Sequence, residues 1–460
     1  MSLYGAGTAK WCPMAAVGCN HATDRRDGLD RTTPDRISTS GSTAMARGDR
    51  AMTYWGTQAT VQARMRTAGI DGWLLMDFRG TNPFMARVLG RGGIGGIVTR
   101  RTFAWLPADP DARPVVLAQA REAHAMADPR WDVRTYTDAS SLHAQLATLG
   151  PKDRIAGATV AMEVSPLGAL PYVSRIDAGT VGLIESLGAT VVTSADLLQD
   201  CLARLSADQV AQHARAALLI DKAKDDAFAF VANQIAAGHP VDEFAVQSRL
   251  MDRFAADGLV TDAAPTVACG PNSARGHYAP RPGHARTIAS DDWLLIDLWA
   301  RLDVPGSPYA DVTWVAWTGP SPVPARHRAV FGIVRDARDL AVSMISDAAQ
   351  AGHTLQGWMV DRAVRDFIAE SGHGPQFPHR TGHNLGPEEV HGSAGVCLDD
   401  FETHDTRLIV PGVAFSVEPG IYLDGEFGVR LELNVVMGAD GPEVHTPIQT
   451  DIVVVGGGRG

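Results

Sequence analysis

The strongest constraint on how this chain folds comes from four carboxylates and one histidine in apolar surroundings. They stand in the segments DWLLIDLW, YADVTWVAW, TGHNLG, FSVEPGIY and GVRLELNVV, as Asp297, Asp311, His383, Glu418 and Glu432. A charged side chain in a hydrophobic strand costs several kcal/mol unless a partner or a metal neutralises it. Because all five fall between residues 297 and 432, we expect them to share one metal site.

The carboxylates form two pairs with equal spacing along the chain. Asp297 and Asp311 lie 14 residues apart around the turn signal PGSP, and Glu418 and Glu432 lie 14 apart around an Asp-Gly turn. Positions equally distant from a hairpin turn face each other across its two strands. We therefore expect two cross-strand carboxylate pairs.

Period-2 alternation separates polar from apolar faces in the strands of the second pair. In the strand around Glu432, one face holds Arg430, Glu432 and Asn434, and the other face holds Val429, Leu431 and Leu433. In the preceding strand, one face holds Ala414, Ser416 and Glu418, and the other holds Val413, Phe415 and Val417. We expect the first face of each strand to point at a site and the second at a core.

The charge of the cluster predicts the number of metals. Four carboxylates bring −4, which two divalent cations balance while leaving room for a bridging hydroxide. Oxygen-rich ligands with one imidazole suit Mn²⁺, Co²⁺, Fe²⁺ or Zn²⁺ better than a thiolate-type zinc site does. Two such metals generate a nucleophile near neutral pH and polarise a carbonyl.

Three more histidines lie nearby in sequence: His277 in GPNSARGHYAP, His379 in FPHRTGH and His391 in EEVHG. An imidazole can orient a substrate carbonyl or stabilise a tetrahedral intermediate. A solvated or core histidine is the ordinary alternative for each, as an exposed or paired acid is for each carboxylate taken singly. The co-occurrence of five apolar contexts favours the site.

Composition excludes other classes of protein. The 460 residues exceed what one core usually organises, which favours two domains and a tail. The net charge of −11 argues against nucleic acid as a partner, and no apolar run is long enough to suggest a membrane partner. The amino-terminal residues match a secretory signal poorly. Five scattered cysteines suit reduced thiols in a cytoplasm.

The chain divides into three regions. Residues 1–50 lack periodicity, and we expect a disordered or cloning-derived extension. Residues 51–205 alternate strands and amphipathic helices, as an α/β domain does. Residues 206–460 begin with a long helix, from the N-cap Ser206 to a Gly before Pro240. Helices are also predicted at 241–258, 326–350 and 355–371, and strands between them carry the carboxylates.

Two other motifs are interpreted as non-functional. GRGGIGG at 90–96 contains a G-x-G-x-x-G match, but a dinucleotide fingerprint needs a strand before it and a helix after it. Here a helical pattern precedes the glycines and a strand follows, so we expect a flexible loop. Cys12 and Cys19 near His21 have no second cysteine pair, and we interpret them as tail thiols.

From about residue 206 to 450 the chain resembles the pita-bread metallopeptidases, and within them the Xaa-Pro aminopeptidase and prolidase branch. GHYAP, TGHNLG with a following VHG, VEPGIY and FGVRLE stand in that branch's order. Residues 55–205 resemble the smaller N-terminal domain of creatinase and prolidase. The resemblance implies an α/β fold: a creatinase/prolidase-like domain at 51–205, then a pita-bread catalytic domain at 206–460 with a pseudo-twofold sheet, usually in a homodimer.

The resemblance also implies residue roles. Asp297 would chelate one metal, Asp311 and Glu432 would bridge both, and His383 with Glu418 would complete the other. The implied catalytic residues are His277, His391 and the proton-shuttling Glu418. The implied substrate-binding residues are His277, His379, His391 and Arg430, the last also a partner of the metal carboxylates.

Four features depart from the family pattern without removing a ligand. The Asp297–Asp311 interval is longer around PGSP, and the His383–His391 interval is longer through Pro387. Trp314 stands where an Arg is often found, and Leu433 stands where an acid is common. These departures concern the substrate more than the metals.

The leading hypothesis is a dinuclear metal-dependent exopeptidase, an Xaa-Pro aminopeptidase or Xaa-Pro dipeptidase acting on small peptides in the cytoplasm. A metal-bridging hydroxide would attack the scissile carbonyl, and Glu418 would pass its proton to the imide nitrogen. We expect two divalent ions, Mn²⁺ first, with Co²⁺, Zn²⁺ or Fe²⁺ as alternatives. A second hypothesis is a non-peptidase of the same fold acting on a small C–N or C–S substrate, creatinase-like or a sulfonium lyase. A binding module without catalysis is disfavoured because all five ligands are present.

Overall fold

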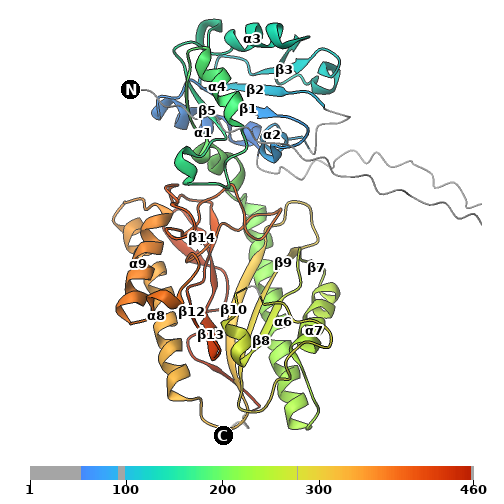
Figure 1. Cartoon of the computed structure of the whole chain (residues 1–460), viewed down its shortest axis with the longest axis vertical. Helices are drawn as coiled ribbons and strands as arrows, with labels where there is room; N and C mark the ends of the chain where they lie inside the picture. The colour runs from blue at the N-terminus through green and yellow to red at the C-terminus, as the bar shows by residue number, and fades with distance from the viewer. Residues whose placement is uncertain (1–52, 92–98, 277, 457–460) are drawn as a thin grey trace, which may run out of the picture. The chain divides into compact units, whose positions relative to one another are not determined.

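The computed structural model describes residues 53–91, 99–276 and 278–456 (Figure 1). The predicted extension at 1–50, most of the glycine motif at 90–96, the thiols near His21, and His277 lie outside the described residues. All described residues belong to one compact unit, Gly48–Gly460. The division into domains at residue 205 stays a prediction. No helix of the described ranges is long and apolar enough to cross a membrane.

The first part of the chain forms the α/β sheet that alternating patterns predict. Its six strands are ordered β4-β3-β2-β1-β5-β6, with antiparallel pairing only at β1–β2 and β2–β3. They span Gly72–Asp77 (β1), Thr102–Pro107 (β2), Val115–Gln119 (β3), Asp132–Tyr136 (β4), Thr159–Met162 (β5) and Thr190–Thr193 (β6). The helices are Tyr54–Thr67 (α1), Pro83–Val88 (α2), Ala139–Ala147 (α3), Ala178–Ser186 (α4) and Ala195–Leu198 (α5). Helix α2 precedes the glycine motif and β2 follows it, which is not the order of a dinucleotide fingerprint.

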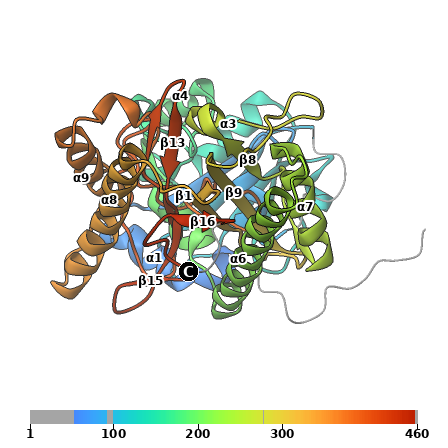
Figure 2. The same ribbon diagram turned by 90° about the horizontal axis from the view of Figure 1, so that it is seen from below.

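Four long helices organise the second part, as their start and stop signals predict. They span Ala207–Ala236 (α6), Glu243–Ala256 (α7), Ala325–Gln350 (α8) and Gly357–Glu370 (α9). A capping box between Ser206 and Gln209 begins α6. The pair α6–α7 lies on one side of the strands and α8–α9 on the other (Figures 1 and 2). This repeated helix-pair order agrees with the predicted pseudo-twofold arrangement.

Three sheets lie between these helix pairs. The first has the order β16-β10-β9-β7, with β8 also paired to β9. Its strands are Leu259–Val260 (β7), Thr266–Cys269 (β8), Trp293–Leu302 (β9), Ala310–Thr318 (β10) and Val453–Val455 (β16). The second has the order β11-β14-β15, spanning Ala414–Val417, Leu433–Met437 and Pro442–Val444, and the third is the hairpin β12–β13, spanning Gly420–Leu423 and Phe427–Arg430.

The predicted hairpin of the two glutamates is confirmed. Ser416 pairs with Asn434 in β11–β14, and Gly420 pairs with Arg430 in β12–β13. When either register is continued along the strands, Glu418 lies opposite Glu432, in the gap between the β11–β14 and β12–β13 pairings. The alternating faces are also confirmed, since Phe415, Val417, Val429 and Leu433 all belong to one buried apolar cluster.

The predicted pairing of the two aspartates is wrong by two residues. Asp297 faces Thr313 across the ladder, and Asp311 faces Trp299. The loop between β9 and β10 is asymmetric because the residue just before β10 bonds outside the hairpin: Tyr309 N donates to Gly386 O at 3.0 Å. The outgoing arm pairs instead with β7, through Leu302 and Leu259. The aspartates are therefore diagonal neighbours on one face.

Two histidines, one of them fully buried, connect α6 with the end of β15. His213 of α6 is fully buried, and its Nδ1 lies 3.1 Å from Nδ1 of His445, just after β15. Burial, with the nearby His445, lowers the pKa of His213 to about 3. His213 therefore stays neutral in the folded protein at pH values where an unfolded histidine is protonated.

We predict that this pair contributes to acid sensitivity. Between about pH 6.5 and pH 3 the unfolded chain binds a proton that folded His213 does not, so stability falls as pH falls, by up to about 1.4 kcal/mol per pH unit. His213→Gln should flatten this dependence in urea unfolding measured from pH 4 to 7. Replacement of the exposed His353 by Gln is the control and should keep the wild-type slope. An unchanged slope in His213→Gln would contradict the prediction.

Candidate metal centre

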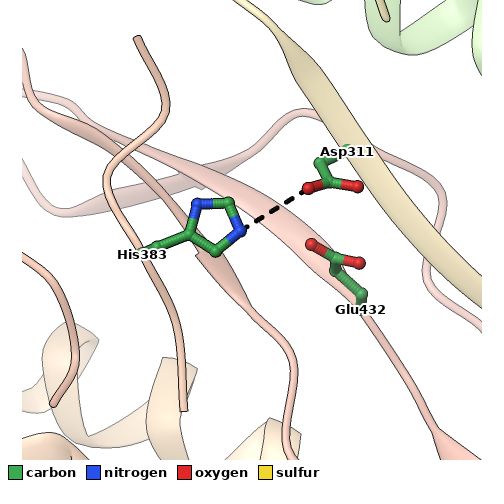
Figure 3. Close-up of side chains that lie close together, drawn as sticks. All are labelled: Asp311, His383 and Glu432. Carbon is green, nitrogen blue, oxygen red and sulfur yellow. Dashed lines mark ion pairs between the residues drawn. The ribbon is translucent and has the colours of Figure 1, made fainter. Parts of the chain in front are cut away.

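Three predicted ligands converge on one point between the sheets (Figure 3). Asp311 comes from β10, Glu432 from the residue before β14, and His383 from the segment that follows α9. One ligand atom from each lies within 4.8 Å of the others, and all three side chains are buried. His383 Nε2 is 3.5 Å from Asp311 Oδ2. This spacing suits a divalent cation held by two carboxylates and an imidazole.

The other two predicted ligands join this cluster from opposite ends. Glu418 Oε1 lies 3.1 Å from His383 Nε2. Asp297 is connected through the Thr313 hydroxyl, which lies 2.8 Å from Glu432 Oε2 and 3.2 Å from Asp297 Oδ1. The structure thus brings all five residues into one continuous network, with Asp311 and Glu432 at its centre.

Arg430 is the main cation beside the carboxylates. Its guanidinium pairs with Asp297 and donates to Thr313 Oγ1 at 2.9 Å and to the Tyr422 hydroxyl at 2.9 Å. It lies farther from Glu418, at 3.9 Å. The predicted partnership of Arg430 with the carboxylates agrees with this geometry.

Backbone contacts set the positions of the ligands. Ser416 accepts from His383 N at 3.0 Å and donates its hydroxyl to Glu418 Oε1 at 3.0 Å, so one side chain aligns both. The Asn434 amide binds both the N–H and the carbonyl of Asp311. Gly382 lies so close to Ser416 that an added Cβ would be 1.9 Å from its carbonyl oxygen. Only glycine therefore fits beside His383 without a backbone shift.

Burial and crowding perturb the titration of the cluster. Burial, with repulsion from Asp297, raises the pKa of Asp311 to about 7, although the hydrogen bond from His383 acts to lower it. Burial and the charges of Asp311 and Glu418 raise the pKa of Glu432 well above its usual range. Burial opposes protonation of His383, but its bonds to Asp311 and Glu418 raise its pKa to about 9.

Glu418 is the exception among these carboxylates. Burial favours its neutral form, but the hydrogen bond and charge of His383, with Arg430, hold its pKa well below the usual range. The metal-free cluster therefore relieves its negative charge by keeping protons on His383 and Glu432, while Glu418 stays ionised.

Two oxygens of the cluster have no hydrogen-bond partner among the described residues: Asp311 Oδ1 and Glu432 Oε1. Both atoms are buried, and an unpaired buried carboxylate oxygen is costly. The opposite oxygens of the same carboxylates face His383 and Thr313. A bound cation would give both of these oxygens a partner, so the residues present fit a divalent metal ion.

The predicted substrate histidines are placed differently from one another. His391 is exposed, and its ring lies 4.2 Å from that of His383, edge to face. His379 Nδ1 lies 2.8 Å from Arg380 O and its Nε2 lies 2.8 Å from the Tyr422 hydroxyl. Because a carbonyl only accepts, Nδ1 carries the proton and Nε2 accepts from Tyr422. Burial lowers the pKa of His379 to about 4, which agrees with a neutral ring.

Three of the four departures from the family pattern make their contacts outside the cluster of predicted ligands. Trp314 lies on the opposite face of β10, where Lys224 of α6 sits 3.4 Å from the ring centroid. Leu433 belongs to the apolar core. In the lengthened segment after His383, Glu388 pairs with Arg87 at 3.0 Å.

Sequence reasoning missed Thr313 and Tyr422 as members of the site. Thr313 binds Asp297, Glu432 and Arg430, and Tyr422 binds His379 and Arg430. The signal was available: period-2 counting places Thr313 on the face of Asp311 and Tyr422 on the face of Glu418.

Comparison with known proteins identifies the family. Residues 211–439 match the model of metallopeptidase family M24, and the chain belongs to this family. An Xaa-Pro dipeptidase of Lactobacillus helveticus is 30% identical over 189 residues, which are 41% of this chain and 46% of that protein. The chain thus matches about half the length of this curated relative.

Solved structures share the fold over most of the chain. The dipeptidase PepE of Mycobacterium ulcerans has a TM-score of 0.63 at 22% identity, covering 88% of this chain and 99% of that one. An X-prolyl aminopeptidase of Caenorhabditis elegans, described as a cytosolic enzyme with a di-nuclear active site, has a TM-score of 0.57 at 16% identity, covering 87% and 63%. The predicted pita-bread fold class is confirmed.

We predict that Thr313→Val destabilises the metal-free protein by about 1–3 kcal/mol, because Arg430 Nε and Glu432 Oε2 lose a buried partner without a change of shape. Urea unfolding in the presence of a chelator would measure this. Thr190→Val, at an exposed position of β6, is the control and should change stability by less than about 0.5 kcal/mol. Equal stability of the two variants would mean that Thr313 does not connect the carboxylates.

Proposed function

We propose that this metallopeptidase uses two divalent cations to hydrolyse Xaa-Pro bonds at the N-terminus of short peptides or dipeptides. The observation that carries the proposal is that one buried oxygen of Asp311 and one of Glu432 have no hydrogen-bond partner within the described part of the chain. The other oxygen of Asp311 faces His383, and the other oxygen of Glu432 faces Thr313. Their central place between Asp297 on one side and His383 with Glu418 on the other supports bridging roles for both.

Charge supports two cations rather than one. Four carboxylates and Arg430 sum to −3 when His383 is neutral, as a metal ligand must be. One divalent cation leaves −1 in a buried site, whereas two bring the sum to +1. The second arrangement favours an anionic nucleophile and an electron-rich carbonyl. When bound, the cations would activate water and polarise the scissile carbonyl.

Protein groups would then move the proton and hold the substrate. Glu418 lies at the edge of the cluster, with its Oε1 3.1 Å from His383 Nε2, so its carboxylate would take a proton from the attacking water and deliver it to the imide nitrogen. His391 is exposed beside His383 and is suited to donate to the substrate carbonyl or the tetrahedral intermediate. His277 is proposed, with His391, to hold the substrate carbonyl and the tetrahedral intermediate. His379 would act through Tyr422, since both of its ring nitrogens are engaged.

The choice of proline peptides rests on the relatives, several of which are named as Xaa-Pro dipeptidases or prolidases. Mn²⁺ is the first choice of metal, on the oxygen-rich ligand set. A homodimer and a cytoplasmic location are part of the proposal. The described cysteines, Cys201, Cys269 and Cys397, are buried free thiols, which suits a reducing compartment.

Metal content and substrate range test the proposal together. The purified protein should bind two equivalents of Mn²⁺ and hydrolyse Xaa-Pro dipeptides, Xaa-Pro-Yaa tripeptides or both. Turnover of dipeptides alone would indicate a prolidase, and turnover of tripeptides an aminopeptidase. Two bound metals without turnover of any proline peptide would overturn the peptidase assignment in favour of a C–N or C–S substrate.

We predict that Glu418→Ala lowers kcat by at least about 100-fold, because it removes the proposed proton carrier as well as a ligand. Glu426→Ala is the control, since Glu426 follows the neighbouring strand β12 and pairs only with Arg326 among the described ion pairs. Steady-state kinetics on a proline dipeptide would measure both. Full activity in Glu418→Ala would mean that the reaction occurs elsewhere.

A further inference from the structure

A buried ion pair on α9 lies behind the segment that carries His379 and His383. Asp361 is fully buried, and Arg365, one turn later, binds it from Nε at 2.8 Å and from Nη2 at 3.2 Å. The Arg365 guanidinium lies between two aromatic rings, 4.4 Å from Phe377 and 4.2 Å from Phe401. A charge pair this deeply buried is weak evidence for stability alone, because desolvation offsets most of its attraction.

Four further hydrogen bonds of the pair are made to the segment 377–381, and a fifth comes from Asp400 N, which donates to Asp361 Oδ2 at 2.7 Å. Asp361 Oδ1 accepts from Thr381 N at 2.9 Å and from the Thr381 hydroxyl at 2.6 Å. Arg365 donates to Phe377 O at 3.0 Å and to His379 O. Four hydrogen bonds therefore fix a stretch that belongs to no helix or strand and that leads directly to His383.

Thr381 passes this constraint to the proposed metal ligands. Its carbonyl accepts from Glu418 N at 2.7 Å, on the side away from Asp361. Two residues later, His383 exchanges backbone and hydroxyl bonds with Ser416, which also binds Glu418. The backbones of His383 and Glu418 are therefore both held in position relative to Thr381, and hydrogen bonds to Asp361 hold Thr381 itself.

From these contacts we infer that Asp361 is a positioning residue for His383 and Glu418, acting through Thr381 and assisted by Arg365. The inference rests on the proposed metal-dependent function. Asp361 touches neither metal ligand side chain, so its effect is on geometry: it sets the distance between the imidazole and the carboxylate before a cation binds. Outer partners of this kind tune metal affinity by about 10–100-fold.

The test compares Asp361→Asn with a matched buried pair. Asp200 is also fully buried and pairs with Arg204 one turn later, and it binds Arg64 rather than any predicted ligand. Asp200→Asn therefore removes the same charge with a similar loss of ion pairing. Thr381→Val is a milder second variant, which removes only the hydroxyl bond to Asp361 and remains informative if Asp361→Asn does not fold.

Each protein is stripped of metal and titrated with Co²⁺, recording the dissociation constant and the visible d–d spectrum, and its thermal midpoint is measured separately. We expect Asp361→Asn to raise the dissociation constant about 10–100-fold and to alter the spectrum. Thr381→Val should show a smaller change in the same direction, and Asp200→Asn should bind as the wild type does despite its loss of stability.

Wild-type affinity and spectrum in both Asp361→Asn and Thr381→Val would overturn the inference while leaving the proposed function intact. An equal loss of affinity in Asp200→Asn would also overturn it, since affinity would then follow global stability. A wild-type protein that binds no Co²⁺ would overturn the proposed function and the inference together.

Discussion

The structure depends on the burial of four carboxylates around one histidine and one arginine. Mutual repulsion and desolvation both oppose this arrangement. Without metal, His383 and Arg430 supply positive charge, and Glu432 holds a proton. Among the residues that the structure describes, Asp311 Oδ1 and Glu432 Oε1 still lack a hydrogen-bond partner. A fold that keeps such a cluster together must bind its backbone firmly from outside.

The surrounding elements supply that support. Asn434 binds the backbone of Asp311, Ser416 aligns His383 with Glu418, and the Thr313 hydroxyl connects Asp297 to Glu432. Behind them, α9 holds Thr381 through Asp361. Each contact is from a neutral group or a paired charge, so the supports add little net charge to the site. The apolar faces of the same strands pack into the core, which stabilises the sheet from its other side.

Much of the fold and the site could be predicted because the governing signals are local. The N-cap at Ser206 and the alternation around Glu432 each act over a few residues, and both are confirmed. The first hairpin register could not be predicted in this way. It is decided by Tyr309 bonding to Gly386 and by Leu302 pairing with Leu259, contacts between segments far apart in sequence.

By itself, the sequence determined which residues carry charge into apolar strands, which strand faces are polar, and which family the motif order resembles. Only the tertiary structure decided that Thr313 rather than Asp311 faces Asp297, that Tyr422 engages His379, and that Asp361 reaches Thr381. The physical reason is range. Alternation and capping are set by neighbours along the chain, whereas hydrogen bonds between segments exist only after the sheets and α9 have packed around the carboxylates.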